Sequence, residues 1–288
     1  MLVLGFPDYM SQAQRLATAI GAPLEMIGLH RFPDGESLVR LPAQVPGDVI
    51  ICRSLDQPNA KLIELMLSAA TARDLGARHI SLVSPYLCYM RQDAVFNRGE
   101  AVSQHIVGRF LADLVDEVVT VDPHLHRTGE LAEAVPAARV IAVASAPLMG
   151  PFLRDRLAHP LLVGPDSESE QWVRQVCEDT GFDYVVGRKQ RRGDRDVFVT
   201  LPDYDYAGRE AVLVDDVAST GQTLVSATRG LYERGAAAVH VLVAHALFVD
   251  DALQSLRDAG VGEVWSTDSV AHSSNVIELA QLLADVVK

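Results

Sequence analysis

Residues 211–224 read Ala-Val-Leu-Val-Asp-Asp-Val-Ala-Ser-Thr-Gly-Gln-Thr-Leu, and this stretch decides the fold. Its four apolar residues, 211–214, predict a buried parallel strand, because the run is too short for an independent helix. Two carboxylates, Asp215 and Asp216, end the expected strand, and a helix is expected to begin near Gln222 after a small turn. A strand, a turn and a helix in this order predict an α/β element with a cradle for phosphate.

A phosphate cradle needs donors, and the turn supplies them. Gly221 lets the backbone approach an anion, and hydroxyl groups come from Ser219, Thr220 and Thr223. Two carboxylates beside this turn suit a ligand with hydroxyls, because carboxylates accept hydrogen bonds from them. A phosphorylated ribose meets both demands. The alternative is that the aspartates cap the helix or end a solvated strand, but the sequence on both sides favours the ligand interpretation.

Composition limits the classes of protein. The 288 residues can form two domains with sizeable cores, and 49% hydrophobic with 22% charged residues is typical of a globular chain. No apolar run could span a membrane, and Met1–Tyr9 is too short and too acidic for a signal peptide. Cys52, Cys88 and Cys177 lack disulfide or zinc spacing, which favours a reducing cytoplasm. The net charge of −13 argues against a nucleic-acid partner.

An acidic chain that binds phosphates needs local positive charge. A divalent cation bound with the substrate could provide it. A basic cluster could also do so, and residues 188–195, Arg-Lys-Gln-Arg-Arg-Gly-Asp-Arg, place five cations within eight residues. The alternative for this cluster is a solvated loop.

Strand-like and helix-like runs alternate along the whole chain, which predicts mainly parallel sheets with helices on their faces. We expect a domain boundary near Pro136–Val140, giving domains at residues 1–138 and 139–288, with the last helix able to pack on the first domain. In the helix expected at 99–114, Val102, Ile106, Phe110 and Leu114 form a stripe that predicts its core face. Strands are expected at 49–53, 79–84, 117–122, 139–144, 161–164, 183–186, 211–215, 238–246 and 263–267. The other helices are expected at 11–20, 59–75, 168–180, 222–234, 250–259 and 276–287.

Two further segments combine unusual residue types. Phe32-Pro33-Asp34-Gly35-Glu36 is the chemistry of a tight turn. Arg91-Gln92-Asp93 follows the strand that ends at Ser84, and ligands bind at such carboxyl ends of parallel strands. An Arg and a Gln there could bind a purine nucleotide and its phosphates, or could form a surface ion pair.

Metal ligands are harder to assign. His124 follows the strand expected at 117–122, where it could be a metal ligand or an ordinary polar loop residue. Mg²⁺ prefers oxygen ligands, so the residues alone leave His124 open. Asp166 follows the strand at 161–164 and is either a metal ligand or the N-cap of the next helix.

Taken together, these segments match one family. The stretch at 211–224 resembles the phosphoribosyl-pyrophosphate (PRPP) loop of the type I phosphoribosyltransferase-like superfamily. Over essentially its whole length the chain resembles the ribose-phosphate diphosphokinases, with residues 96–103 and 122–124 closer to the shorter, archaeal-type branch. The resemblance implies two phosphoribosyltransferase-like domains, each a mainly parallel sheet flanked by helices. The matching segments, in family order, are 32–36, 91–93, 122–124, 189–191 and 212–224.

The resemblance also implies roles for single residues. It places Mg²⁺ at His124 and Asp166, and reaction chemistry on a loop with Lys189 and Arg191. After Asp166 the family usually has a glycine-containing turn, whereas this chain has Ser-Glu-Ser-Glu at 167–170, which puts that metal role in doubt. The implied ATP site comprises Phe32, Asp34, Gly35, Glu36, Arg91, Gln92 and Asp93. The implied ribose 5-phosphate site comprises Arg191, Asp215, Asp216, Ser219, Thr220, Gly221, Gln222 and Thr223.

The implied reaction is Mg²⁺-dependent transfer of the β,γ-diphosphoryl group of ATP to the 1-hydroxyl of ribose 5-phosphate, which yields PRPP and AMP. An ATP site shared between subunits would require a homo-oligomer, at least a dimer. Two alternatives stay open: a PRPP-dependent phosphoribosyltransferase, and a non-catalytic regulatory homologue. The chain length and the two implied nucleotide segments argue against the first. The presence of Lys189 and Arg191 with both aspartates argues against the second.

Overall fold

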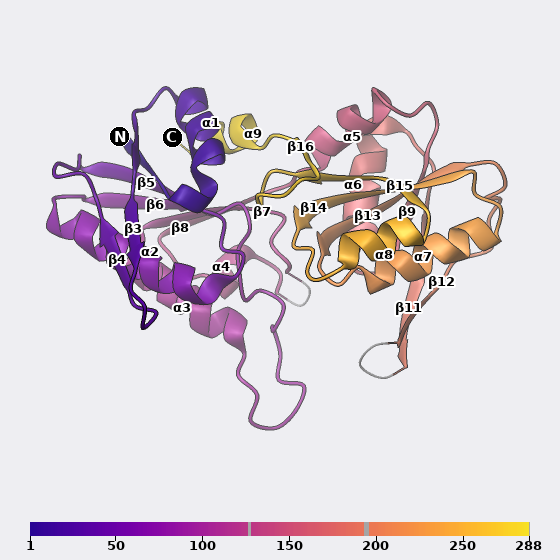
Figure 1. The fold of residues 1–288 in the computed structure, drawn as a ribbon, viewed down its shortest axis with the longest axis horizontal. Helices are drawn as coiled ribbons and strands as arrows, with labels where there is room; N and C mark the ends of the chain where they lie inside the picture. The colour runs from indigo at the N-terminus through magenta and orange to yellow at the C-terminus, as the bar shows by residue number, and fades with distance from the viewer. Residues whose placement is uncertain (126–127, 193–195, 288) are drawn as a thin grey trace. The chain divides into compact units, whose positions relative to one another are not determined.

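The computed structural model describes residues 1–125, 128–192 and 196–287, without the side chains of 179 and 191–197. The chain forms two compact units (Figure 1). The first contains Met1–Val143, Ser269–Ala271 and Leu279–Lys288, and the second contains Ala144–Asp268 and His272–Glu278. No helix in the described part is long and apolar enough to cross a membrane.

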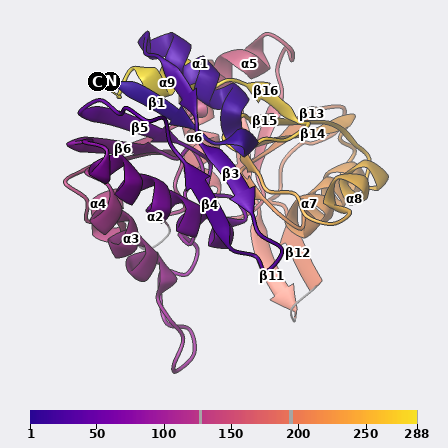
Figure 2. The same cartoon turned by 60° about the vertical axis from the view of Figure 1, so that its left-hand side comes forward.

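The first unit is built on a parallel sheet with the strand order β2-β1-β5-β6-β7-β8. Most of these strands are short apolar runs, as expected for strands that are covered on both faces. In sheet order they are Leu24–Met26 (β2), Leu2–Gly5 (β1), Asp48–Cys52 (β5), His79–Val83 (β6), Glu117–Val121 (β7) and Arg139–Val143 (β8). An antiparallel hairpin of Gly28–Arg31 (β3) and Ser37–Arg40 (β4) lies beside this sheet, with β4 against α2 (Figure 2).

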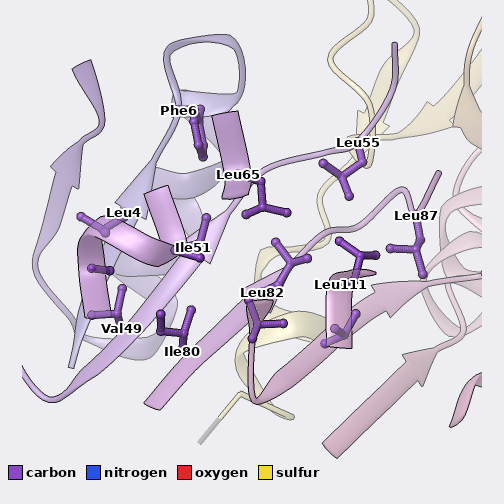
Figure 3. Close-up of a cluster of buried hydrophobic side chains, with 14 of the residues drawn as sticks. Leu4, Phe6, Val49, Ile51, Leu55, Leu65, Ile80, Leu82, Leu87 and Leu111 are labelled. Atoms are coloured by element: carbon purple, nitrogen blue, oxygen red, sulfur yellow. The ribbon is translucent and has the colours of Figure 1, made fainter. Parts of the chain in front are cut away.

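Alternate residues of these strands contribute to one core cluster. Leu4, Ile51 and Leu82 point into one core cluster with Leu65 of α2 and Leu111 of α3 (Figure 3). Helices α1 and α9 pack against each other in the same unit. The helices of this unit are Pro7–Tyr9 (η1, a 3-10 turn), Met10–Ile20 (α1), Pro58–Asp74 (α2), Ser103–Leu114 (α3), Leu131–Ala134 (α4) and Ala280–Ala284 (α9).

The second unit repeats the plan with the order β10-β9-β13-β14-β15-β16, again parallel throughout. Leu213 of its central strand packs in one core with α7 and α8, while Val212 and Val214 pack in another with α5 and α6. Its strands are Tyr184–Val186 (β10), Leu161–Gly164 (β9), Glu210–Ala218 (β13), Ala238–Ala246 (β14), Val261–Thr267 (β15) and Asn275–Ile277 (β16). Its helices are Ala146–Arg154 (α5), Glu170–Thr180 (α6), Gln222–Glu233 (α7) and Ala252–Asp258 (α8).

The basic cluster lies on a second antiparallel hairpin. Arg188–Arg192 (β11) pairs with Asp196–Thr200 (β12), with Lys189 opposite Val199. In Figure 1 this hairpin extends away from the sheet of the second unit. The cluster is therefore a strand for most of its length, and not the open loop that its composition suggests.

The α/β class with two mainly parallel sheets is confirmed, with corrections to single elements. Arg139–Val143 pairs with β7 and so belongs to the first sheet, beyond the boundary placed at 138/139. The helix expected at 276–287 is wrong in its first part. Asn275 binds the Ser266 hydroxyl and the Thr267 carbonyl through its side-chain amide, at 3.0 and 2.6 Å, and this anchors β16 on β15 before α9 begins.

The predicted core face of α3 is confirmed at Phe110 and Leu114, which pack against the core cluster, but it is wrong at Ile106. Ile106 is 51% exposed, and the buried residues of this helix are Gln104, Gly108 and Leu111. Gly108 explains the rotation, because the absence of a side chain there lets α3 approach the backbone of Ala134. The backbone contact sets the orientation of the helix, and the longest apolar stripe does not.

We expect the cysteines to be unreactive in the folded protein. All three are buried, and burial raises the pKa of the Cys88 and Cys177 thiols to about 12, so almost no thiolate forms at pH 8. Titration with Ellman's reagent at pH 8 should therefore label none of the 3 cysteines within minutes, and all 3 after unfolding in guanidinium chloride. Rapid labelling of one thiol in the native protein would contradict this packing.

Candidate active site

Two neighbouring strands of the second sheet bring carboxylates to one edge. β9 pairs with β13, with Val163 opposite Leu213, so the segments that follow these residues reach the same edge of the sheet. The strand β13 does not end at Asp215 as expected. It continues to Ala218, which lies opposite Ala246 of β14. Both predicted aspartates therefore lie within a hydrogen-bonded strand, which fixes their backbone.

Asp166 closes the turn between β9 and α6. Its Oδ1 accepts hydrogen bonds from the backbone N–H groups of Glu168 and Ser169, at 3.0 and 3.2 Å. The Ser169 hydroxyl donates in return to the Asp166 carbonyl at 2.7 Å. Ser-Glu-Ser-Glu thus forms a tight turn without glycine, which one oxygen of Asp166 stabilises. The N-cap of α6 is Ser169, so the alternative that Asp166 caps this helix is wrong.

The basic hairpin supplies a cation to this edge. Lys189 Nζ donates to the other oxygen of Asp166, Oδ2, at 3.2 Å. Both side chains are largely shielded from water, with 26% and 10% exposed. Two residues that the sequence predicts in separate roles are therefore in contact. The side chain of Arg191, predicted beside Lys189, lies outside the described part of the chain.

The same edge concentrates negative charge. The pKa of the Asp215 carboxyl is raised well above its ordinary value, because burial disfavours its charge and the carboxylates of Asp216 and Asp166 repel it. Lys189 acts in the opposite direction, as does the backbone N–H of Asp216, which donates to Asp215 Oδ1 at 3.0 Å. A ligand that brings hydroxyl donors or a cation to these carboxylates would relieve the repulsion.

The predicted phosphate turn leads directly into α7. Gly221 is the N-cap of the helix with φ +71°, a left-handed conformation that favours glycine. Because glycine has no side chain, no cap side chain occupies the first N–H groups of the helix. Ser219 and Thr223 are half-buried, whereas Thr220 and Gln222 are exposed. The turn and the start of α7 therefore follow the strand–turn–helix order predicted from the sequence.

In the first unit, Phe32–Glu36 forms the tight turn of the β3–β4 hairpin. Phe32 N donates to the Glu36 carbonyl at 2.8 Å, and Gly35 has φ +95°. The turn is exposed, Phe32 by 39% and Asp34 and Glu36 as well. Its base is held by the buried Glu64 of α2, which accepts a hydrogen bond from Ser37 Oγ at 2.9 Å.

Arg91-Gln92-Asp93 lies in the loop between β6 and α3. Arg91 is exposed, while Gln92 and Asp93 are half-buried. Glu100 organises this loop, because its Oε2 accepts from the backbone N–H of Phe96 at 2.9 Å and from Gln92 Nε2 at 3.4 Å. The side-chain amide of Asn97 also donates to Glu100. This hydrogen bond, followed by those from the backbone and from Gln92, holds the pKa of the Glu100 carboxyl below its ordinary value.

His124 follows β7 in a loop whose first residue, Asp122, has φ +37°, an unusual conformation for a residue other than glycine. The His124 side chain is half-buried. Among residues 1–125, 128–192 and 196–287, no three His, Cys, Asp or Glu side chains converge to form a metal site made by protein alone. The predicted residues thus form one group in the second unit (Asp166, Lys189, Asp215, Asp216 and the turn after β13) and three separate loops in the first.

Several residues that support these loops escaped sequence reasoning. Glu64 and Arg53 form a buried ion pair at 2.7 Å, with the Arg53 guanidinium 4.0 Å from the centre of the Phe6 ring. Glu100 and the fully buried Gln104 organise the loop around Arg91. Charged and amide side chains are usually exposed to solvent, so no pattern in the sequence indicates that these residues support the loops.

Comparison with known proteins gives a single answer. The N-terminal domain of ribose phosphate pyrophosphokinase matches residues 1–114, and the phosphoribosyl synthetase-associated domain matches residues 199–286. The ribose-phosphate pyrophosphokinase of Methanothermobacter thermautotrophicus is 33% identical over the whole of both chains. That of Methanopyrus kandleri is 32% identical over 100% of this chain and 99% of its own.

The architecture agrees with a solved structure. Phosphoribosylpyrophosphate synthetase from Mycobacterium smegmatis superposes with a TM-score of 0.84 at 23% identity, over 99% of this chain and 96% of that one, which shows the fold. The two full-length relatives show more, since each is above 30% identical. The chain therefore belongs to the ribose-phosphate pyrophosphokinase family and is an enzyme of that class.

Proposed function

We propose that this enzyme transfers the β,γ-diphosphoryl group of ATP to the 1-hydroxyl of D-ribose 5-phosphate, giving PRPP and AMP. One observation carries the proposal: carboxylates, a lysine and a glycine-capped helix N-terminus lie at one edge of the second sheet. Asp166, Lys189 and Asp215 interact electrostatically there, and Gly221 caps α7 on the same strand–turn–helix element. These are the groups that a phosphorylated sugar and a transferred diphosphoryl group need.

The acceptor site follows from β13 and its turn. The hydroxyls of Ser219, Thr220 and Thr223, with the N–H groups behind Gly221 and Gln222, would bind the 5-phosphate. Asp215 and Asp216 would accept hydrogen bonds from the ribose hydroxyls. The raised pKa of Asp215 supports this role, because a hydroxyl donor offsets the repulsion between neighbouring carboxylates.

The donor site would lie in the first unit. Phe32 would stack on adenine, with Asp34, Gly35 and Glu36 beside the ribose, and Arg91, Gln92 and Asp93 would complete the nucleotide site. The exposure of the Phe32 turn is consistent with service to a neighbouring copy of the chain, so we infer a homo-oligomer of at least two copies. The absence of a disulfide among the described cysteines agrees with a cytoplasmic enzyme.

Mg²⁺ is the cation that the family implies, and the residues present could supply one or two of its ligands. Mg²⁺ commonly keeps several waters and binds through one or two protein ligands together with substrate phosphates. Asp166 offers a carboxylate oxygen that is now paired with Lys189, at the edge where Asp215 and Asp216 concentrate negative charge. Asp166 and His124 are each proposed as a ligand of Mg²⁺, which when bound would neutralise phosphate oxygens. The lysine must then leave Asp166 Oδ2.

The protein's own part in the chemistry would be alignment and neutralisation. The carboxylates of β13 would orient the ribose so that its 1-hydroxyl faces the β-phosphorus of ATP. As the bond to the leaving AMP breaks, Lys189 and Arg191 would stabilise charge on the transferred group and on AMP. The shielding of Lys189 from water strengthens this interaction.

Identification of the nucleotide product tests the proposal. The purified protein with ATP, Mg²⁺ and ribose 5-phosphate should form AMP and PRPP in equal amounts, measured by ion-exchange chromatography. Formation of ADP would mean transfer of the γ-phosphoryl group alone and would overturn the mechanism. Release of pyrophosphate from PRPP with a purine base would favour a phosphoribosyltransferase. Binding of both substrates without turnover would favour a regulatory homologue.

A further inference from the structure

Gln104 is a fully buried polar residue in the first turn of α3, and its backbone N–H and side-chain amide form hydrogen bonds with loop residues. Its backbone N–H donates to the Gln92 carbonyl and its side-chain Nε2 to the Met90 carbonyl, each at 3.2 Å. Its side-chain Oε1 accepts a hydrogen bond from Thr128 Oγ1 at 2.7 Å. One residue therefore contacts both the loop before α3 and the loop after β7.

The two carbonyls that Gln104 binds flank Arg91. Holding Met90 O and Gln92 O fixes the peptide unit before Arg91 and the peptide unit after Gln92, and leaves the Arg91 side chain exposed. The segment needs such support, because Tyr89 just before it has φ +60°, a conformation that costs energy in a bulky residue. Strained backbone persists when surrounding hydrogen bonds determine it.

The other end of the Gln104 amide reaches the loop of His124. Thr128 stands four positions after His124 and is 9% exposed, so its hydroxyl bond to Gln104 is shielded from water. A buried amide that loses one partner leaves an unsatisfied polar group, and such groups are expensive. The bond thus ties the position of one loop to that of the other.

We propose that Gln104 is a positioning residue, which sets the ATP-binding loop around Arg91 against the loop that carries His124. This inference rests on the proposed roles of Arg91, Gln92 and His124. Gln104 touches no substrate; it acts through the backbone of Met90 and Gln92 and through Thr128. Its loss should impair use of ATP, and the acceptor site on β13 should be unaffected.

Steady-state kinetics on the full-length enzyme test the inference. Gln104→Leu conserves the shape but leaves the Met90 carbonyl and the Thr128 hydroxyl without their partner. It should raise KM for ATP about tenfold, while KM for ribose 5-phosphate changes by less than about twofold. Thr128→Val should show a smaller effect of the same kind, and Thr128→Ser, which keeps the hydroxyl, should restore wild-type values. In the double variant the two increases in KM for ATP should be less than additive, because both substitutions break the same hydrogen bond between Thr128 and Gln104.

Arg91→Ala and thermal melting separate the possible outcomes. A lowered melting temperature with an unchanged KM for ATP in both Gln104→Leu and Thr128→Val would make Gln104 merely structural and overturn the inference. An equal rise in both KM values would overturn it as well. If Arg91→Ala raises KM for ATP but Gln104→Leu and Thr128→Val do not, the inference about Gln104 fails while the ATP-binding role of the Arg91 loop stands. If Arg91→Ala has no effect, the assignment of the loop to ATP fails and the inference falls with it.

Discussion

Lys189→Ala should leave a folded protein whose turnover is about 10²–10³-fold lower, the usual cost of losing one charge-stabilising donor. Lys189 brings a positive charge to the acidic edge of the second sheet, where its Nζ donates a hydrogen bond to Asp166 at 3.2 Å. Asp166 keeps its hydrogen bonds to Glu168 and Ser169 without it, so the turn should survive. The measurement is kcat for AMP formation, with circular dichroism to verify the fold.

Arg188→Ala is the matched control for this substitution. Arg188 precedes Lys189 on β11, so it points to the opposite face of the hairpin, and its removal subtracts the same charge. It should retain turnover within about threefold of wild type, because an exposed charge contributes little. Near-normal turnover of Lys189→Ala, or an equal loss in Arg188→Ala, would remove Lys189 from the mechanism.

Gly108→Ala should destabilise the first unit by about 3 kcal/mol, at the upper end of overpacking costs. A Cβ at this position would lie 1.7 Å from the carbonyl oxygen of Ala134 and 2.7 Å from its carbonyl carbon. Both atoms are backbone, so no side chain can rotate away, and α3 must move as a whole. The melting temperature should fall by roughly 6–12 °C, which differential scanning calorimetry can measure.

Gly230→Ala provides the comparison within a helix. Gly230 lies inside α7, and a Cβ there meets only the Leu201 side chain, at 3.4 Å or more. Alanine is the better helix former, so this variant should be as stable as wild type or more stable by up to about 1 kcal/mol. A melting temperature of Gly108→Ala equal to that of Gly230→Ala would refute the close approach of α3 to the chain at Ala134.

Most of the parallel strands were predicted from the sequence because they are short apolar runs, but β1, β2 and β16 were missed. Leu161–Gly164 and Ala238–Ala246 were expected within the bounds that the structure shows. The hairpin strands β3 and β11 were missed because they carry His and Arg residues without an apolar run. Helix α5 was missed because it contains Pro151 in its interior, which argues against a helix from sequence alone.

The site was predictable as segments but not as contacts. Asp166, Lys189 and the aspartates of β13 were recognised one by one, yet 23 residues separate the two partners of the ion pair. Whether they meet depends on how the β11–β12 hairpin folds back, which no local pattern encodes. The supporting residues Glu64 and Gln104 were invisible for a different reason, since burial of a polar side chain is decided by tertiary packing.

The length of β13 has a consequence for substrate choice. The strand carries both aspartates and stays paired with β14 as far as Ala218, and the turn into α7 follows at once. The separation between the aspartates and the turn is therefore set by backbone hydrogen bonds within one sheet. In the proposed acceptor role, this element would fix the distance between the groups that bind the sugar hydroxyls and those that bind the phosphate, so it would select sugar phosphates by their length.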